Sequence, residues 1–576
     1  MCGILGLISN KKIDKEKAIN VLNGQKHRGP DNTSYHYSSN YFIGHNRLSI
    51  LDLSKNGNQP FISNCGNYVL SFNGEIYNYN EIRKILINKG YQFISNSDTE
   101  VLLYGYIEFK DKILSMIDGI FAFIIYDKIN NEFFIARDHF GVKPLYYFES
   151  SDLVVIASEI KTIKNYSNKI NFEGYVNFLA TGSISEPRTI LKNVKSLPQG
   201  SCAVIKNLKF KIKKYYQLNN NLDDDSPFNI DPKELKKLII KSISSQLISD
   251  APIGIFLSGG IDSSVLTAYA SKINSKINTI SLTFSDGYSE GNFQKIISQA
   301  FKTNHHEVKI GEKEFLDSYL NFIESIDQPT VDGFNTFFVS KATKELGIKC
   351  ALSGIGSDEI FYGYPSYNNA SYLNNLRKFK FFINSRLLYG KYKKLDYLKC
   401  NFPHNIYLPS RSVFSILEIA EILGLEEKRI IRIIDNIFEL DKIQTNNELS
   451  IIDHFEFNHY MKNQLLRDSD IFGMYNSVEI RVPFLSKDLV EFSKKIMPNK
   501  KVSKKYNKSL LVDSVKDDLP SEIYNRTKKG FELPYKKWIS QNYDILKIDK
   551  KTERLAKNNK WHWSKLWAIN ILNNYN

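Results

Sequence analysis

The pattern of hydrophobic and polar residues divides the 576-residue chain into two parts with different periodicity. Over about the first 205 residues, short apolar or alternating runs are separated by glycine and Asn-Gly signals, a pattern typical of strands and turns. A helix is predicted over Asp98–Glu108, with Ser97 or Asp98 as its cap. This half is therefore predicted to be a layered α+β domain. Its predicted strands are Tyr41–Ile43, Tyr68–Phe72, Ile120–Tyr126, Glu132–Ala136, Leu145–Phe148 and Leu153–Ala157.

A polar, acidic stretch with two prolines, residues 218–232, has the composition of a linker. After it, predicted strands alternate with helices that begin near Asp262 and cover about Ser289–Lys302, which indicates right-handed crossovers and a doubly wound parallel sheet. Beyond about residue 365 the pattern is mostly helical. We therefore predict domains at 1–217 and 233–576, joined by the linker 218–232. The strands of the second domain are Gly254–Leu257, Thr279–Phe284, His306–Ile310 and Cys350–Leu352.

The composition narrows the class of protein. Hydrophobic residues make up 42% of the chain and charged residues 24%, which excludes wholesale disorder. Five cysteines exclude a disulfide framework. Apolar runs such as Phe121–Ile125 are far shorter than the roughly 20 residues that span a bilayer, and no apolar signal peptide follows Met1. A reducing, cytoplasmic setting without a membrane partner fits best.

The net charge of +15, from 77 Lys and Arg against 62 Asp and Glu, raises the question of a nucleic-acid partner. The lysines are scattered among asparagines and isoleucines. The basic stretches Lys11–Lys17, Lys206–Lys214 and Lys500–Lys508 lack a stacking-aromatic motif. Nucleic-acid binding is therefore not expected, although a non-catalytic, charge-driven binding protein stays as the alternative of another class. The oligomeric state is open, with a homodimer as one option.

A candidate nucleophile stands at the start of the chain. Removal of Met1 would leave Cys2 with a thiol and a free α-amine, whose reference pKa of about 7.7–8.0 lets it accept a proton near neutral pH. A thiol beside its own base is an activated nucleophile. Gly3 lets the backbone come close to a substrate carbonyl.

Eight colinear motifs over about 160 residues extend this hypothesis. With them the first half resembles the glutamine amidotransferase domains of the amino-terminal-nucleophile class, which have an αββα fold. The motifs are MCGILG at 1–6, HRGPD at 27–31, GHNRLSILD at 44–52, FNGEIYNY at 72–79, SDTE at 97–100, DGIFAFIIYD at 118–127, ARDHFGVKPLYY at 136–147 and SEIKTI at 158–163.

The resemblance implies a role for each matching residue. Cys2 would attack the glutamine amide and form a thioester, while Asn73 and the Gly74 N–H would form the oxyanion hole. Arg47 would hold the substrate α-carboxylate. Asp98 and Glu75 would meet the substrate α-ammonium or form hydrogen bonds around it. The pocket would be lined by the backbone of Leu48, Ser49, Ile50 and Leu51; Arg28, Arg137 and Asp138 are expected to be structural.

An anion-binding turn is predicted in the second half, where SGGIDS at 258–263 follows a strand and opens a helix. Glycines permit a tight turn whose N–H groups converge on an anion, and Asp262 could hold Mg²⁺. No Walker A lysine follows. The turn resembles the pyrophosphate loop of ATP pyrophosphatases. The implied nucleotide contacts are Leu257, Ser258, Gly259, Gly260, Asp262, Ser263 and Leu282.

A second signature, SGIGSDE at 353–359, supports that resemblance and implies that Ser353 and Gly354 meet the nucleotide while Asp358 assists Mg²⁺. Carboxyl ends of neighbouring parallel strands are where such sheets bind ligands. Lys528 is the candidate for contacting pyrophosphate, with Lys529 as the alternative. The motifs at 465–485 and 525–534 also match this architecture.

Taken from residue 1 to about 540, the chain resembles the glutamine-hydrolysing asparagine synthetase family. The resemblance implies that glutamine supplies ammonia, that MgATP adenylylates the aspartate side chain, and that ammonia displaces AMP. Two positions depart from the pattern of this family. Ile355 stands where an acidic residue is common, and Ser486 stands where the family usually has an aspartate with a structural role. Ile355 motivates the alternative that another carboxylate, such as a uronic acid, is amidated. Glu456 or His454 could supply the missing function.

Overall fold

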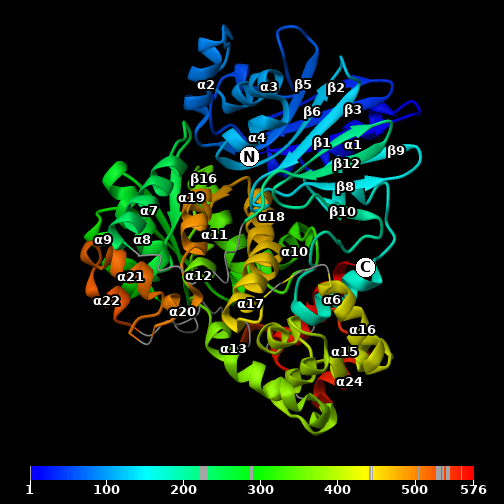
Figure 1. Ribbon diagram of the computed structural model, residues 1–576, viewed down its shortest axis with the longest axis vertical. Coiled ribbons are helices and arrows are strands. Elements are labelled where there is room, and N and C mark those ends of the chain that lie inside the picture. Colours follow the sequence, from blue (N-terminus) through cyan, green and yellow to red (C-terminus); the bar gives the residue numbers. More distant parts are fainter. Residues whose placement is uncertain are drawn as a thin grey trace.

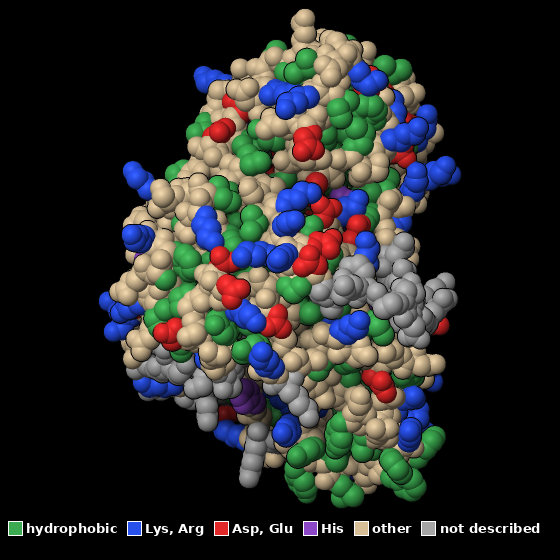
Figure 2. All heavy atoms as spheres, turned by 60° about the vertical axis from the view of Figure 1, so that its left-hand side comes forward, with side chains coloured by type: hydrophobic (Ala, Val, Ile, Leu, Met, Phe, Trp, Pro, Cys, Tyr) green, Lys and Arg blue, Asp and Glu red, His purple; other side chains and the backbone are tan. Residues whose placement is uncertain are grey.

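The computed structural model describes residues 2–218, 231–285, 290–439, 443, 445–503, 505–526, 534, 537–539, 542, 545–559 and 561–575. Within these ranges no helix is long and apolar enough to cross a membrane. Figure 1 shows the amino-terminal half at the top, a second sheet with its helices below it at the left, and a helical region at the bottom and lower right. On the face drawn in Figure 2, Lys and Arg side chains are scattered, while hydrophobic side chains gather at the lower end.

Two antiparallel sheets of six strands each form the amino-terminal half. Their orders are β10-β8-β9-β1-β3-β2 and β12-β11-β7-β6-β5-β4. The first contains β1 (Gly3–Ser9), β2 (Asn32–Ser38), β3 (Tyr41–Arg47), β8 (Tyr146–Glu149), β9 (Leu153–Ala157) and β10 (Val194–Ser196). The second contains β4 (Phe61–Ile62), β5 (Tyr68–Ile76), β6 (Gly119–Asp127), β7 (Glu132–Arg137), β11 (Ser201–Lys206) and β12 (Lys209–Lys214).

Alternation along the strands builds the layers of this half. Ile4 packs with Ile124 in the core between the two sheets, whereas the next residue, Leu5, packs with Leu22 of α1 (Lys15–Asn23) on the outer face. On the outer face of the second sheet lie α2 (Tyr79–Asn88) and α3 (Asp98–Phe109). The predicted αββα arrangement is therefore confirmed, and Cys2 lies at the edge where β1 begins.

A five-stranded parallel sheet, in the order β15-β14-β13-β16-β17, organises the second half. Because β14 and β16 lie on opposite sides of β13, the chain reverses its winding direction there, which makes the end of β13 a topological switch point. The strands are β13 (Ile253–Phe256), β14 (Asn278–Phe284), β15 (Asn304–Ile310), β16 (Cys350–Leu352) and β17 (Glu479–Arg481). One face is covered by α7 (Pro232–Gln246) and α8 (Ile261–Ile273), the other by α10 (Glu312–Ser325) and α11 (Phe334–Glu345).

The remainder is mostly helical, as predicted. After α12 (Ser357–Ile360), α13 (Pro365–Leu376) leads to the 3-10 segments η4 (Arg377–Phe382), η5 (Ser385–Leu387) and η6 (Gly390–Lys399). The chain continues through α15 (Ile416–Leu423), α16 (Glu427–Phe438), α17 (Glu448–Phe455), a π-helical segment η8 (Glu456–Leu466) and α18 (Arg467–Tyr475). The last helix, α25 (Trp563–Tyr575), packs Trp567 against the stacked pair Phe322 and Phe334.

Every predicted strand is present, with ends shifted by a few residues, and the helices predicted near 98, 262 and 289 are α3, α8 and α9 (Gly291–Ala300). β2 was not predicted, because its sequence, NTSYHYS, has few apolar residues to mark a strand. The other strands that were not predicted are β1, β4, β10, β11, β12 and β17. Most of the linker, 219–230, lies outside the described residues.

Candidate active sites

Cys2 is buried between the two halves of the molecule. Its backbone N–H donates to Asn73 Oδ1 at 2.9 Å, and its carbonyl accepts from Arg28 Nε at 3.2 Å. Burial raises the pKa of the Cys2 thiol, while the Leu48 N–H and the Arg47 guanidinium act in the opposite direction. The thiol therefore has a donor and a positive charge in place to stabilise a thiolate when substrate arrives.

Asn73 and Gly74 lie next to Cys2 at the end of β5. The Asn73 side chain is fully buried, and its Nδ2 has no hydrogen-bond partner within the described part of the chain. Gly74 has φ +155°, and a Cβ there would lie 2.1 Å from the Ile120 carbonyl of β6, so only glycine fits. A donor without a partner beside a nucleophile is the arrangement an oxyanion hole requires.

Arg47 is held by the loop that follows β3. Its Nη1 donates to the Ser54 carbonyl at 2.7 Å and to Asn58 Oδ1 at 2.9 Å, and its Nη2 contacts the carbonyls of Leu51 and Asp52. These bonds order the segment Leu48–Leu51, which the sequence predicts to line the glutamine pocket. In the structure, Arg47 thus shapes this segment in addition to placing positive charge near Cys2.

Glu75 and Asp98 lie together at the boundary with the second half. Asp98 Oδ2 accepts from the Ile76 N–H at 2.9 Å, and Glu75 Oε1 pairs with Arg481 Nη2 of β17 at 3.3 Å. Burial raises the pKa of Asp98 to about 6 and that of Glu75 well above its usual range, where Asp98 adds to the effect. Acidic groups at this edge suit an ammonium ligand, whose positive charge would lower both pKa values.

A second contact joins Cys2 to the other half through Arg28. Besides the Cys2 carbonyl, its guanidinium binds Glu159 Oε1 at 3.2 Å and Asp470 Oδ2 of α18 at 2.7 Å. All three side chains are buried. Arg28 was expected to be structural, and its contacts link the Cys2 backbone with Glu159 and with α18.

The predicted phosphate turn follows β13 at the switch point. Gly259 has φ +80°, a backbone conformation that residues with a Cβ rarely adopt, so the turn favours glycine there. Gly260 is the N-cap of α8. The Ser258 N–H and Ser258 Oγ both lie near Ser263 Oγ, at 3.2 and 3.1 Å. The Gly260 N–H also donates to Ser258 Oγ, at 3.3 Å, and Ser258, Gly260 and Ser263 all line the adjacent cavity at the amino terminus of α8, where an anion is favoured.

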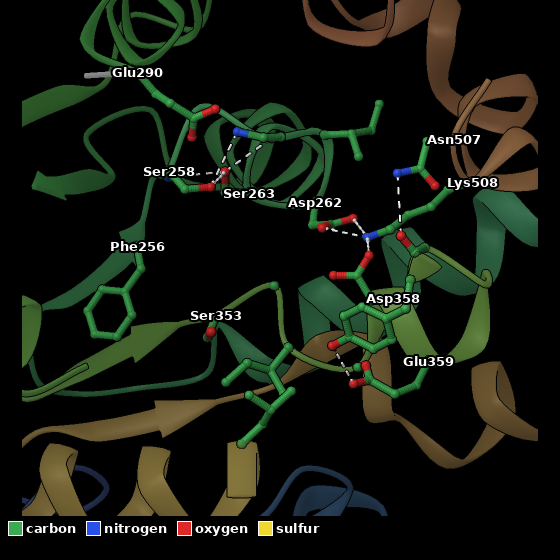
Figure 3. A pocket seen from close by; sticks show the side chains of 18 of the residues that line it. Phe256, Ser258, Asp262, Ser263, Glu290, Ser353, Asp358, Glu359, Asn507 and Lys508 are labelled. Carbon is green, nitrogen blue, oxygen red and sulfur yellow. Dashed lines mark hydrogen bonds and ion pairs between the residues drawn. The ribbon is translucent and has the colours of Figure 1, made fainter. Parts of the chain in front are cut away.

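The second signature follows β16, the neighbour of β13, and touches the first. A Cβ at Gly354 would lie 2.9 Å from Asp262 Cβ, and Ser357 Oγ donates to Asp262 Oδ1 at 2.6 Å. The two loops line one cavity of about 990 Å³ (Figure 3). Of the residues predicted to bind ATP, those lining it are Leu257, Ser258, Gly260, Asp262, Ser263, Leu282, Ser353 and Gly354. Lys528 and Lys529 lie outside the described residues.

Lys508 joins the two predicted metal ligands. Figure 3 shows its ammonium between Asp262 and Asp358, and Nζ lies 2.6 Å from both Asp262 oxygens and 2.8 Å from Asp358 Oδ1. Burial would lower the pKa of Lys508, but the two carboxylates more than offset this and raise it. The two carboxylates predicted to serve Mg²⁺ therefore lie close together and are paired with a lysine of this chain.

Ile355 and Glu359 face the same cavity. Ile355 lines it without a polar atom, as the sequence predicts, but the buried Glu359 brings a carboxylate. Glu359 Oε1 accepts from Tyr364 OH at 2.8 Å, while Oε2 has no hydrogen-bond partner among the described residues. Burial, then the negative charge of Asp358, raises the pKa of Glu359 to about 7.

Comparison with known proteins agrees with this geometry. Residues 1–216 match the family description "glutamine amidotransferase domain", and residues 234–561, more than half of the chain, match "asparagine synthase". The chain belongs to the asparagine synthase family. It is 30% identical over 561 residues to asparagine synthetase (glutamine-hydrolyzing) 1 of Bacillus subtilis, covering 94% of this chain and 88% of that protein.

Two further relatives are also named as glutamine-hydrolyzing asparagine synthetases. A putative asparagine synthetase (glutamine-hydrolyzing) 2 of Methanocaldococcus jannaschii is 33% identical over 416 residues, covering 66% of this chain and 79% of that protein. Asparagine synthetase B (glutamine-hydrolyzing) of Escherichia coli is 30% identical over 393 residues, covering 64% and 66%.

Three residues of the asparagine synthase half were missed from the sequence. Lys508 stands in a lysine-rich stretch, and nothing local distinguishes it from a solvated lysine. Arg526, which lines the cavity and pairs with Glu290 at 2.7 Å, lies inside a matched motif but was not singled out. Glu359 ends the second signature but was given no role, because the sequence-based prediction assigned the function missing at Ile355 to residues of a later helix.

The two residues suggested there, Glu456 and His454, are not among the described residues that line the cavity. Glu456 is buried and paired with Arg411, Nε to Oε1 at 2.9 Å and Nη2 to Oε2 at 2.8 Å, and also accepts from Ser366 Oγ. Because its acceptor oxygens are occupied by Arg411, Glu456 is suited to position the helices beside the cavity.

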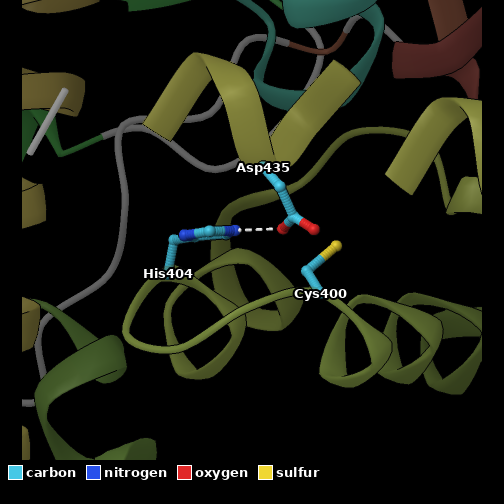
Figure 4. A group of neighbouring side chains, drawn as sticks. All are labelled: Cys400, His404 and Asp435. Carbon is cyan, nitrogen blue, oxygen red and sulfur yellow. Dashed lines mark hydrogen bonds and ion pairs between the residues drawn. The ribbon is translucent and has the colours of Figure 1, made fainter. Parts of the chain in front are cut away.

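A buried group of Cys400, His404 and Asp435 lies apart from both sites (Figure 4). His404 Nε2 and the Asn401 N–H lie 2.8 and 2.9 Å from Asp435 Oδ1, and the His404 ring stacks on Phe438. Burial raises the pKa of the Cys400 thiol well above its usual range, so the neutral thiol is favoured. Through these contacts the group fastens α16 to the segment that follows η6, which explains its residues without a bound metal ion.

Proposed function

We propose that this chain makes asparagine from aspartate, with glutamine as nitrogen donor and ATP as the source of activation. The observation that carries the proposal is one cavity lined by the two loops after β13 and β16, with their serines and two carboxylates, and by Lys508, in a chain that also holds Cys2 beside Asn73. The names of the relatives support the same reaction.

Glutamine hydrolysis would begin at Cys2. The thiolate attacks the amide carbon, Asn73 Nδ2 and the Gly74 N–H receive the oxyanion, and loss of ammonia leaves a thioester that water cleaves. The nitrogen of Cys2, 2.9 Å from Asn73 Oδ1, becomes the α-amine once Met1 is removed and can take the thiol proton. Arg47, Glu75 and Asp98 would recognise the α-carboxylate and α-ammonium of glutamine.

Activation of aspartate would take place in the cavity of the second half. An oxygen of the side-chain carboxylate attacks the α-phosphorus of ATP, the bond to the β-phosphate breaks, and pyrophosphate leaves. N–H groups of the Ser258–Gly260 turn would hold the phosphates, and Lys508 and Arg526 would offset the charge that develops on pyrophosphate.

Asp262 and Asp358 fit a magnesium ion. Both carboxylates already face one cation, Lys508 Nζ, and Mg²⁺ in nucleotide sites is held by one or two carboxylates together with phosphates. When bound, the ion would neutralise phosphate charge at this position.

The amide bond would form when ammonia attacks the acyl-adenylate and AMP leaves. The nitrogen must lose a proton in this step. Glu359 is suited to accept it, because its Oε2 has no partner among the described residues and its pKa of about 7 lies near the working pH of most enzymes. Glu359 would thus perform the proton transfer that Ile355 cannot.

The experiment is analysis by mass spectrometry of the products formed from glutamine, MgATP and aspartate. We expect asparagine, glutamate, AMP and pyrophosphate in equal amounts. AMP without asparagine, or no response to aspartate, would contradict the proposal.

A second candidate is favoured by Ile355, since an apolar side chain in the cavity changes what it can recognise. In that case the chain amidates another carboxylate, for example a sugar uronic acid, with the same chemistry in both halves. AMP formation with a panel of carboxylic acids separates the two: aspartate alone should support it under the first proposal.

A further inference from the structure

An exposed apolar surface lies at the end of α13, the helix whose first residues line the cavity of the second half. Among the exposed large hydrophobic side chains in the described ranges, Phe381 and Phe382 are the most exposed, at 88% and 85%. Figure 2 shows hydrophobic side chains gathered at the lower end of the molecule, where Figure 1 places the segment after α13. The members of this aromatic–basic surface are Tyr372, Phe379, Phe381, Phe382, Leu387, Tyr389 and Tyr392.

The same segment has only positive charge. No Asp or Glu occurs between Glu359 and Asp396, while this stretch contains seven cations: Arg377, Lys378, Lys380, Arg386, Lys391, Lys393 and Lys394. The ammonium groups of Lys380 and Lys391 lie over the neighbouring rings of Phe381 and Tyr392, at 5.8 and 5.5 Å from the ring centroids. Apolar side chains and cations are therefore interleaved on one surface.

The backbone keeps these side chains outside the core. The 3-10 segments η4 and η5 are three to six residues long, and neither buries a large hydrophobic residue. The core under this region is made instead by Tyr397, Leu398 and Cys400 of η6 and its end. Folding alone thus does not require phenylalanines at 381 and 382, and exposed contiguous apolar patches of this kind mark interaction sites.

We propose that this aromatic–basic surface docks the enzyme on an anionic lipid bilayer. Phenylalanine, leucine and tyrosine side chains enter the boundary between headgroups and acyl chains, and lysines and arginines around them pair with lipid phosphates. The surface lies on the bilayer and does not cross it. This departs from the sequence-based expectation of no membrane partner, which depended on the absence of a spanning segment.

Charge distinguishes this occupant from a second copy of the chain. A symmetric dimer through this surface would place the exposed cations Lys378, Arg386 and Lys391 against identical cations. Nearby acidic groups, Glu418 and Glu427, already pair with Lys393 and Lys399 of the same chain. The aliphatic Leu387, 69% exposed, also fits an acyl-chain boundary better than it fits the stacked bases of a nucleic acid.

The test measures sedimentation of the full chain with vesicles of phosphatidylcholine alone and with a 3:1 mixture of phosphatidylcholine and phosphatidylglycerol. We expect binding to the mixture that weakens with salt, and little binding to phosphatidylcholine. Phe381→Ser with Phe382→Ser should lower the partition coefficient at least about tenfold. Lys378→Gln with Lys380→Gln should lower it about 25-fold, at about fivefold per charge.

Leu320→Ser is the matched control, because Leu320 is 75% exposed but lies on α10 outside this surface, and its variant should bind like the parent. All variants should keep the parent's asparagine synthesis in solution. Absence of binding, or equal binding to both vesicles, would overturn the proposal. So would surface variants that change self-association, or the affinity for single-stranded RNA, while vesicle binding stays the same.

Discussion

Substitution of Gly74 by alanine should separate the two activities. The new Cβ would lie 2.1 Å from the Ile120 carbonyl, about 1 Å inside ordinary contact, so β5 and β6 must move apart beside Asn73. The φ of +155° adds strain of about 1–3 kcal/mol. Since the Gly74 N–H is one of two proposed oxyanion donors, kcat for glutamine hydrolysis should fall about 10²–10³-fold.

Gly66→Ala is the control for backbone strain alone. Gly66 also has positive φ, +71°, but nothing lies within 4 Å of its added Cβ, so the cost should be only about 1–2 kcal/mol and glutaminase activity should persist. Glutamate release, ammonia-dependent asparagine formation and the thermal midpoint are measured for both variants. Gly74→Ala should lose only the first activity. Normal glutaminase activity in Gly74→Ala, or an equal loss in Gly66→Ala, would refute the geometric reasoning.

Four further substitutions test the remaining roles. Cys2→Ala should abolish glutamine use and spare ammonia-dependent synthesis, and mass spectrometry of the parent should find Met1 removed; loss of both activities in a folded variant contradicts two separate sites. Asp262→Asn should impair ATP turnover at limiting Mg²⁺, and unchanged turnover removes it from the metal role. Lys508→Met should slow exchange of pyrophosphate with ATP about 10²-fold or more, since it removes the cation held between two carboxylates. Glu359→Gln should leave that exchange intact but slow amide formation about 10²–10⁴-fold. Because the pKa of Glu359 is raised to about 7, the parent's amide formation at constant free ammonia should rise with pH through about 7 and then level off, and the Gln variant should lack this rise.

Local patterns were sufficient to predict ten of the strands, a layered α+β first half and the two glycine-containing loops, whereas the αββα class and the nucleotide role of the loops came from the resemblance to known families. Glycine turns and strand-length apolar runs are properties of neighbouring residues, so the sequence shows them directly. The role of Lys508 depends on Asp262, 246 positions earlier, and no nearby residue indicates that contact. The same holds for Arg481, whose partner Glu75 lies in the other half. Such pairs are decided by tertiary packing, and a single sequence does not reveal them.

The aromatic run near 381 shows a different limit. The sequence predicts only that this region is mostly helical, and a run of apolar residues in a helical region does not by itself show which of them are covered. In the fold these side chains project from short 3-10 turns, and the core is completed by residues further along. Whether an apolar residue is covered depends on what packs above it, and this is not a property of the residue itself.

The guanidinium of Arg28 has a consequence for engineering. It binds the carbonyl of the nucleophilic cysteine with one nitrogen and a carboxylate of α18 with another, without exposure to water. A glutaminase fragment cut off at the linker would keep this cation and Glu159 but lose Asp470, one of the two carboxylates that offset its charge. In chimaeras that exchange halves between homologous enzymes, residues 28 and 470 should therefore be taken from the same parent enzyme.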